Sequence, residues 1–112
     1  MRGLADPRLA AAIRQIHEAP ARSWTVAALA KEAALSRSAF FERFSRTVGV
    51  PPMEYLQGWR MNLAKDLLRR RVGTLDAIAE RVGYGSASAF STAFTRHVGL
   101  PPKRFATTAP MT

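Results

Sequence analysis

The chain carries one stretch of sequence twice, about 50 residues apart. Ten of the seventeen residues at 36–52 recur unchanged 50 positions later, at 86–102. Upstream, residues 25–30 match residues 74–79 at an offset of 49, so the second copy contains one additional residue, Gly85. A repeat at a fixed period indicates one supersecondary unit built twice. The sequence therefore predicts two similar subdomains.

Each copy has the pattern of two short helices separated by a tight turn. Four hydroxyl residues stand where helix N-caps are expected, namely Thr25, Ser36, Thr74 and Ser86. Gly49 and Gly99 are expected to end the second helices in the left-handed conformation, and the prolines that follow cannot continue a helix. The turns are short, at residues 34–35 and 83–85. This is the spacing of a helix-turn-helix unit.

The second helix of each copy divides into an apolar and a polar face. Apolar residues recur at i, i+4 and i+8 and predict a buried stripe of Phe40, Phe44 and Val48, and of Phe90, Phe94 and Val98. The opposite faces carry Ser38, Glu42, Ser45 and Arg46 with Phe41 at the edge, and Ser88, Thr92, Thr95 and Arg96 with Ser91 at the edge. Small polar residues, and arginine without the usual charge pairing, favour close approach to another molecule. The alternative is an ordinary solvated helix surface.

The turn of the first copy contains an unusual residue. Ala34 stands where the second copy has Gly83, at a helix end that is expected to need a left-handed residue. If the backbone there is left-handed, alanine costs about 1 kcal/mol relative to glycine.

The remaining segments predict supporting helices. Asp6 followed by Pro7 is typical of a helix start, and an apolar stripe follows, made of Leu9, Ala12, Ile13 and Ile16. Residues 52–71 predict an uninterrupted helix about 30 Å long. Its expected apolar side consists of Met53, Leu56, Trp59, Leu63 and Leu67. A short closing helix is expected at residues 102–105.

These elements predict an all-α fold in which two helix-turn-helix subdomains are joined by one long linker helix. The expected divisions are a first subdomain with a bracing helix at residues 5–50, the linker helix at 51–71, a second subdomain at 72–107 and a flexible tail at 108–112. One turn of B-DNA measures about 34 Å, so a helix of this length suits two recognition helices in successive major grooves.

The charge of the chain indicates a polyanionic partner. The 112 residues contain 17 Lys and Arg against 8 Asp and Glu, which gives a net charge of +9. Fourteen of the basic residues are arginines, and the planar guanidinium group suits phosphates and guanine edges. Double-stranded DNA is therefore the expected partner. The alternative is a basic module that coats nucleic acid without reading its sequence, or that binds other proteins.

Several function classes find no support in the sequence. The chain has no cysteine, and His17 and His97 stand apart without a second metal ligand, so they are interpreted as ordinary surface or boundary residues. We expect no enzyme activity, no cofactor and no metal. The start of the chain lacks a signal peptide, and no apolar run reaches the roughly 20 residues that span a bilayer, so a cytoplasmic location is expected.

The second repeat and the linker together resemble the C-terminal DNA-binding domain of the AraC/XylS family of bacterial transcription regulators. The most specific residues are 77–84 (AIAERVGY), followed by Phe90, Phe94, Gly99, Pro101 and Pro102. The linker stretch is similar as well, at Tyr55, Leu56, Trp59, Arg60, Met61, Ala64, Leu67 and Leu68. The resemblance covers residues 8–106. It implies about seven helices, two of which enter adjacent major grooves of promoter DNA and thereby regulate transcription at the nucleoid.

The resemblance also suggests roles for individual residues. Base contacts are expected from Ser38, Phe41, Glu42, Ala87, Ser88, Ser91 and Thr92. Phosphate contacts are expected from Ser36, Arg37, Arg46, Arg60, Ser86, Thr95 and Arg96. The second helix departs from the family pattern, because Gly85, Ala87 and Thr92 replace larger polar or charged residues. We therefore expect weaker direct readout from the second subdomain.

The family pattern implies further partners. Most members carry a sensing or dimerisation domain before this module, and residues 3–7 resemble the linker of a cupin-linked subgroup. We therefore expect a fragment of a longer regulator, with RNA polymerase as a further candidate partner. The isolated module is expected to be a monomer, because its internal repeat replaces the symmetry of a dimer.

Overall fold

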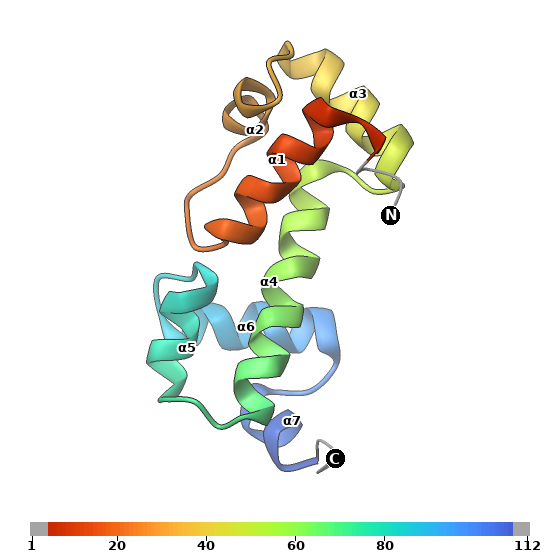
Figure 1. Cartoon of the computed structure of the whole chain (residues 1–112). Helices are drawn as coiled ribbons and strands as arrows, with labels where there is room; N and C mark the ends of the chain where they lie inside the picture. The colour runs from red at the N-terminus through yellow and green to blue at the C-terminus, as the bar shows by residue number, and fades with distance from the viewer. Residues whose placement is uncertain (1–4, 109–112) are drawn as a thin grey trace. The chain divides into compact units, whose positions relative to one another are not determined.

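The computed structural model describes residues 5–108, and these residues form helices, turns and loops without any strand (Figure 1). Seven helices follow one another along this part of the chain: α1 (Pro7–Glu18), α2 (Val26–Glu32), α3 (Arg37–Val48), α4 (Pro52–Arg69), α5 (Leu75–Val82), α6 (Ala87–Val98) and α7 (Pro102–Thr108). The predicted all-α class with seven helices is confirmed.

The chain divides into two compact units, Met1–Gly58 and Trp59–Thr112. In the first unit α2 packs on α1 and α3, and in the second α6 packs on α5 and α7. The helix α4 contributes its first residues to one unit and its remainder to the other. The finer division predicted above stays a prediction, and residues 109–112 of its tail, like residues 3 and 4 of the family-like linker, lie outside the described residues.

The core of the first unit is built from the predicted stripes. Asp6 caps α1 by accepting hydrogen bonds from the backbone of Arg8 and Leu9, and Pro7 is the first helical residue. The buried apolar residues of this unit are Leu9, Ala12, Ile13, Ile16, Trp24, Leu29, Ala30, Ala33, Phe40, Phe44 and Leu56. All four predicted residues of α1 are among them, so this stripe is confirmed. Val48, predicted to be buried, is only partly so.

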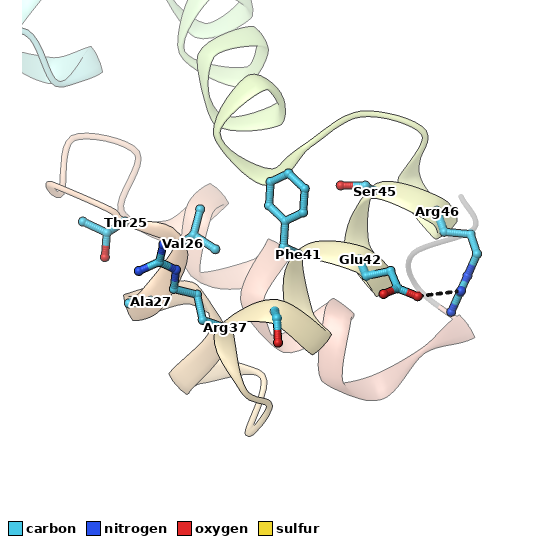
Figure 2. Close-up of a pocket in the computed structure, with 9 residues that line it drawn as sticks. Thr25, Val26, Ala27, Arg37, Phe41, Glu42, Ser45 and Arg46 are labelled. Carbon is cyan, nitrogen blue, oxygen red and sulfur yellow. Dashed lines mark hydrogen bonds and ion pairs between the residues drawn. The ribbon is translucent and has the colours of Figure 1, made fainter.

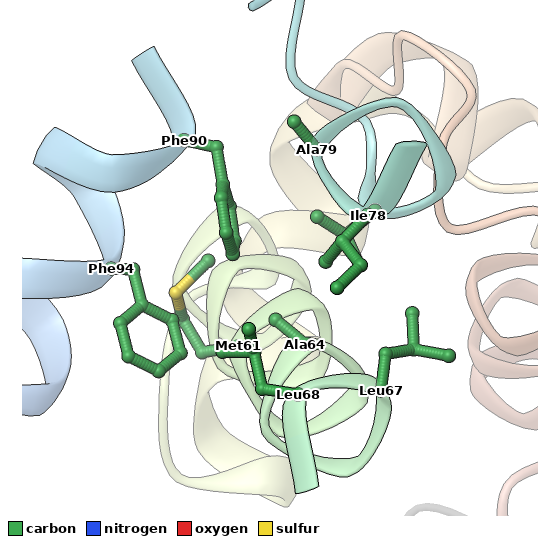
Figure 3. Packing of buried hydrophobic residues seen from close by; sticks show 9 residues of the cluster. Met61, Ala64, Leu67, Leu68, Ile78, Ala79, Phe90 and Phe94 are labelled. Carbon is green, nitrogen blue, oxygen red and sulfur yellow. The ribbon is translucent and has the colours of Figure 1, made fainter. Parts of the chain in front are cut away.

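The core of the second unit gathers around two phenylalanines of α6 (Figure 3). Phe90 and Phe94 are fully buried, with their ring centroids 5.6 Å apart, and Phe105 of α7 meets Phe94 edge-on at 5.5 Å. The helices α4 and α5 supply the rest of this core, namely Met61, Ala64, Leu67, Leu68, Ile78, Ala79 and Val82. Val98 packs against the cluster but stays partly exposed.

The predicted apolar side of α4 was partly wrong. Met53 is 39% exposed, and Trp59 and Leu63 are only partly buried. Leu56 in the first unit and Leu67 in the second are buried as predicted, and Met61, Ala64 and Leu68 of the second unit are buried although they were not predicted to be. The prediction assumed one continuous stripe, whereas successive parts of α4 pack into two different cores. Different residues of α4 are therefore buried in the two cores.

Two helix ends also differ from the prediction. The helix α4 ends at Arg69 rather than near residue 71, because Arg71 adopts a left-handed φ of 52° and the amide of Val72 donates to the carbonyl of Leu67. The helix α7 continues to Thr108, beyond the predicted closing helix at 102–105, so residues 106–108 are helical as well.

The turn chemistry of the two copies matches the expectation closely. The side-chain oxygen of each predicted cap accepts a hydrogen bond from the backbone amide three residues later. The distances are 3.0 Å at Thr25, 3.2 Å at Ser36, 3.1 Å at Thr74 and 3.0 Å at Ser86. Gly49 and Gly99 end α3 and α6 with φ near 99° and 97°. These bonds satisfy amides that a helix start leaves without a partner.

Candidate nucleic-acid interface

Each unit contains a helix-turn-helix whose second helix has one face in the core and one in solvent. The helices α2 and α3 form this pair in the first unit, and α5 and α6 form it in the second. The turns have equivalent hydrogen bonds, from the Leu35 amide to Ala30 at 3.0 Å and from the Tyr84 amide to Ala79 at 2.8 Å. Both turns pass through a left-handed residue, Ala34 at φ 57° and Gly83 at φ 99°. The expected left-handed backbone at Ala34 is confirmed.

The exposed face of α3 forms one side of a groove, which we call the first groove (Figure 2). It is lined by Thr25, Val26, Ala27, Arg37, Ser38, Phe41, Glu42, Ser45 and Arg46. Phe41 is 45% exposed, which is unusual for so large an apolar side chain. An exposed aromatic ring flanked by polar groups is typical of a binding surface.

A second hollow lies on the exposed face of α6, and we call it the second groove. It is lined by Ser91, Thr92, Thr95 and Arg96. These residues stand 50 positions after Phe41, Glu42, Ser45 and Arg46. The repeat in the sequence therefore produces the same kind of surface at the same place in each unit.

The predicted base-contacting residues divide between the two grooves. Ser38, Phe41 and Glu42 are exposed and line the first groove. Ser91 and Thr92 line the second groove, where Ser91 is partly buried. Ser88 is exposed and Ala87 is partly buried at the start of α6, outside the lining of that groove. Their contact with bases stays a prediction.

The predicted phosphate-contacting residues fall into three environments. Arg37, Arg46 and Arg96 are exposed beside the grooves. Ser36 and Ser86 are exposed, and their hydroxyl oxygens accept the capping hydrogen bonds of α3 and α6. A capping hydroxyl keeps its own hydrogen available, so it can still donate to a phosphate.

Arg60 and Thr95 are placed differently from the other predicted phosphate contacts. Arg60 is partly buried, and its guanidinium group lies over the ring of Tyr84, with Cζ 5.9 Å from the centroid. The hydroxyl of Thr95 donates to the carbonyl of Ser91 at 2.7 Å. With its hydrogen engaged in the helix, Thr95 does not donate to a phosphate in this rotamer. The equivalent hydroxyl of Ser45 is buried without a hydrogen bond to the described residues.

Arg46 and Glu42, both on α3, form an ion pair beside the first groove, with Nη1 of Arg46 and Oε1 of Glu42 3.4 Å apart. The sequence predicts arginine on this face without charge pairing, and for Arg46 that is wrong, since Glu42 lies one helical turn earlier. The side chains of Arg46 and Glu42 are 71% and 77% exposed, and such exposed pairs stabilise a protein by about 0 to 1 kcal/mol. Either partner can therefore leave the pair for a ligand at little cost.

The beginning of α2 is part of the first groove, and the sequence did not predict this contribution. Thr25, Val26 and Ala27 line the groove opposite α3. The N-cap pattern at Thr25 predicted where α2 begins, but it did not predict that the beginning of α2 lies next to α3. The distance between these two helices depends on how they pack.

The histidines lie outside both grooves. Nε2 of His17 lies 2.7 Å from the hydroxyl oxygen of Tyr55, and the two rings stack at 6.0 Å. Burial lowers the pKa of His17 below its usual value and raises the pKa of Tyr55. His97 is exposed. Among residues 5–108, no three His, Asp or Glu side chains gather in a group that could hold a metal ion.

Comparison with known proteins decides the family. A family model described as "Helix-turn-helix domain" matches residues 29–108, which is most of the chain. The chain belongs to the AraC-type helix-turn-helix family. The resemblance drawn from the sequence is thereby confirmed at the level of the family, which is one of transcription regulators with a DNA-binding domain.

Named relatives agree with this assignment. The chain is 56% identical over 100 residues to a protein described as an AraC-like transcription regulator in Streptomyces lividans, a match that covers 89% of this chain and 33% of the relative. It is 40% identical over 102 residues to the HTH-type transcriptional regulator AlkR of Acinetobacter baylyi, covering 91% and 33%. The chain thus spans about a third of the length of the curated relatives it matches.

Solved structures show the same fold. The DNA-binding domain of AdpA, a global transcriptional factor solved in complex with a target DNA, matches with a TM-score of 0.83 at 29% identity, over 91% of each chain. The C-terminal domain of AraT, a response regulator of Geobacillus stearothermophilus, matches with a TM-score of 0.86 at 26% identity, covering 95% of this chain and 88% of that one. Within residues 5–108, no helix is long and apolar enough to cross a membrane.

Proposed function

We propose that this chain is the part of a transcription regulator that binds double-stranded promoter DNA, with α3 and α6 in successive major grooves. The observation that carries the proposal is the duplication of one exposed, polar groove on the second helix of each helix-turn-helix. Further support comes from the similar DNA-binding domain of AdpA, which was solved on its target DNA. The 18 residues of α4 correspond to about 27 Å of helix, which is close to one turn of B-DNA.

The two grooves support unequal roles. In the first groove, Glu42 can accept from cytosine N4 and Phe41 can pack on a thymine methyl, while Ser38 can bond either kind of base pair. In the second groove Ser91 and Thr92 offer hydroxyls, with one methyl group on Thr92, and Ala87 at the start of α6, outside the groove lining, offers another methyl group. We therefore assign most of the sequence discrimination to the first unit. The second unit, with Ser88 and Arg96, contributes mainly affinity and register.

The experiment that tests this function is selection of bound sequences from a random duplex pool. We expect a split motif whose two parts are separated by about one helical turn, with the stronger information in one part. Recovery of no preferred sequence would overturn the proposal. The same binding reactions measure the salt dependence of the affinity.

The net charge of +9 favours one competing function, a basic module that coats nucleic acid without reading it. Its affinity would follow counterion release alone and fall by about 10³ to 10⁵ between 50 and 200 mM salt if 6 to 10 phosphates are neutralised. Specific and random duplexes would then bind equally at every salt concentration.

For the whole protein we propose a longer regulator of the same family. The relatives are about three times as long as this chain, which supports an additional domain for sensing or dimerisation, of the cupin-linked kind that residues 3–7 suggest. Such a regulator would act on RNA polymerase at promoters in the cytoplasm, at the nucleoid. The isolated module is proposed to be a monomer, and sedimentation of the 112-residue chain tests this.

A further inference from the structure

Arg60 of α4 lies against the turn that joins α5 to α6. Its guanidinium group sits over the ring of Tyr84, with Cζ 5.9 Å from the centroid. A Cβ atom added to Gly83 would lie 2.9 Å from both Cζ and Nη2 of the same side chain. All three residues belong to the second unit. The guanidinium group therefore occupies the space that a side chain at position 83 would need.

The surroundings of Arg60 differ from those of the arginines beside the grooves. Arg37, Arg46 and Arg96 are exposed, whereas Arg60 is partly buried. Burial lowers the pKa of Arg60 from its usual value, and the charge interaction with Tyr84 acts in the opposite direction. A planar guanidinium group is suited to packing flat on an aromatic ring and on exposed backbone, in a way that a lysine ammonium group is not. This environment fits a packing role better than a phosphate contact.

The contact continues from the turn into α6. The Tyr84 ring packs on Phe90 with 5.8 Å between centroids, and Phe90 is fully buried in the core of the second unit. The amide of Tyr84 donates to the carbonyl of Ala79 at 2.8 Å and so closes α5. Arg60, Tyr84 and Phe90 thus form a continuous row from α4 through the turn to the recognition helix.

The first unit shows what the turn looks like with a side chain at the same position. Ala34 adopts a φ of 57° and is exposed, so its methyl group is accommodated. Gly83 combines a φ of 99° with a guanidinium group beside it, which would have to shift if position 83 carried a side chain. The positive φ is shared by the two turns, and the neighbouring guanidinium group is described for Gly83.

We propose that Arg60 is a positioning residue, which fixes the turn between α5 and α6 and thereby the orientation in which the second unit presents the recognition helix α6. The assignment replaces the phosphate contact expected from the sequence. Its consequence for DNA binding depends on the function proposed above, but the packing role itself does not.

A thermodynamic cycle on the free protein tests the packing role. It compares the wild type, Arg60→Ala, Gly83→Ala and the double variant by equilibrium unfolding in denaturant. The strain from a positive φ at position 83 is present with and without Arg60, so it cancels in the cycle. We expect Gly83→Ala to lower the folding equilibrium constant at least about threefold less in the Arg60→Ala background. Additive effects of the two substitutions would overturn the proposal.

Hydrogen exchange of the free protein gives a local readout. In Arg60→Ala the amides of Gly83 and Tyr84, which donate to the carbonyls of Glu80 and Ala79, should exchange about tenfold faster or more, because the turn has lost the group that holds it. The equivalent amides of Ala34 and Leu35 belong to the other unit and serve as an internal control, with unchanged exchange. Unchanged protection of Gly83 and Tyr84 would also overturn the proposal, even if global stability falls.

DNA binding separates positioning from phosphate contact. For a positioning residue, Arg60→Ala weakens binding while the slope of log affinity against log salt stays the same, and Arg60→Lys does not restore binding. A phosphate contact would instead lower the slope by about one, and lysine would largely restore it. Either a lower slope or rescue by lysine would overturn the proposal. If the wild type binds no DNA, the proposed function fails, while the cycle and the exchange measurement still decide the role of Arg60.

Discussion

Ala34 and Gly83 occupy equivalent positions in the two turns with different side chains. Both have a positive φ, which an L residue adopts at a cost of about 1 kcal/mol relative to glycine. The sequence alone indicated this strain, because the repeat aligned an alanine with a glycine at a helix end. The close approach of Arg60 to Gly83 could not be predicted in the same way, since it depends on the rotamer of a side chain 23 residues away.

The first prediction follows from the strain at Ala34. We expect Ala34→Gly to leave the free energy of unfolding unchanged or to raise it by up to about 1 kcal/mol, as measured by denaturant titration and thermal melting. The matched control is Ala39→Gly, also exposed but inside α3, which should lower stability by about 1 kcal/mol. A clear fall in the midpoint for Ala34→Gly would contradict the left-handed turn.

Glu42 is the side chain on which base discrimination in the first groove depends most. We expect Glu42→Ala to relax the preference at one or two base pairs of the selected site, by about 1 to 3 kcal/mol of discrimination. Competition binding with single-base variants of the site measures this. Equal losses on the selected site and on random duplex would remove the base-reading role of Glu42.

Arg96 is exposed in the second groove, and we assign it to a backbone phosphate. Arg96→Ala should weaken binding to all sequences alike and reduce the salt slope by about one. Arg81 is a matched control, because it is also exposed but lies on α5 outside the lining of both grooves. A change of base preference in Arg96→Ala would show that the assignment is wrong.

At the scale of helices, the N-terminal caps were easier to predict than the buried faces. Caps at Thr25, Ser36, Thr74 and Ser86 are local interactions, decided within three residues, and the structure has all four. The buried face of α4 is decided by two separate cores, and the single stripe read from its sequence failed at Met53. The pairing of Glu42 with Arg46 was within reach, since the two residues are four apart on one helix.

The contact between α1 and α4 through His17 and Tyr55 predicts a pH dependence. Burial lowers the pKa of His17 in the folded state, so the unfolded chain takes up a proton first as the pH falls through about 6.5. The stability of the first unit should therefore decrease from pH 7.5 to pH 5. The decrease should be smaller in His17→Gln, measured by denaturant titration at each pH.

A wild-type stability that rises on acidification over the same range, or an unchanged slope in His17→Gln, would contradict the role of the partly buried His17–Tyr55 pair. Tyr55→Phe tests the hydrogen bond separately from the ring stacking.

For the whole molecule, the internal repeat was sufficient to predict the fold class, and the charge indicated a polyanionic partner. The family was predicted from the motif residues at 77–84 and after them, together with the linker stretch, through their resemblance to known regulators. None of these features depends on the details of packing. The two grooves were predicted through the exposed faces of α3 and α6, while the contribution of Thr25, Val26 and Ala27 was missed. That contribution requires two helices to meet, which a periodicity along one helix does not describe.

The proposed use of both units on one DNA face predicts a strict spacing between the two parts of the binding site. Inserting about five base pairs between them rotates one part by half a turn and should abolish specific binding. Inserting about ten base pairs restores the rotation but not the distance, and we expect binding to stay weak because the proposed function uses two successive major grooves. Gel-shift titration of the spaced duplexes measures both, and full binding at either spacing would contradict binding in successive major grooves.

The duplication of the grooves within one polypeptide has a consequence for how a target can evolve. In a symmetric dimer, any substitution appears in both subunits, and both halves of a palindrome must change together. Here Phe41 and Ser91 occupy equivalent positions in the two copies and are already different, so each copy can diverge on its own. A DNA site that is read by two different copies is asymmetric. The protein can therefore bind that site in one orientation only relative to the promoter.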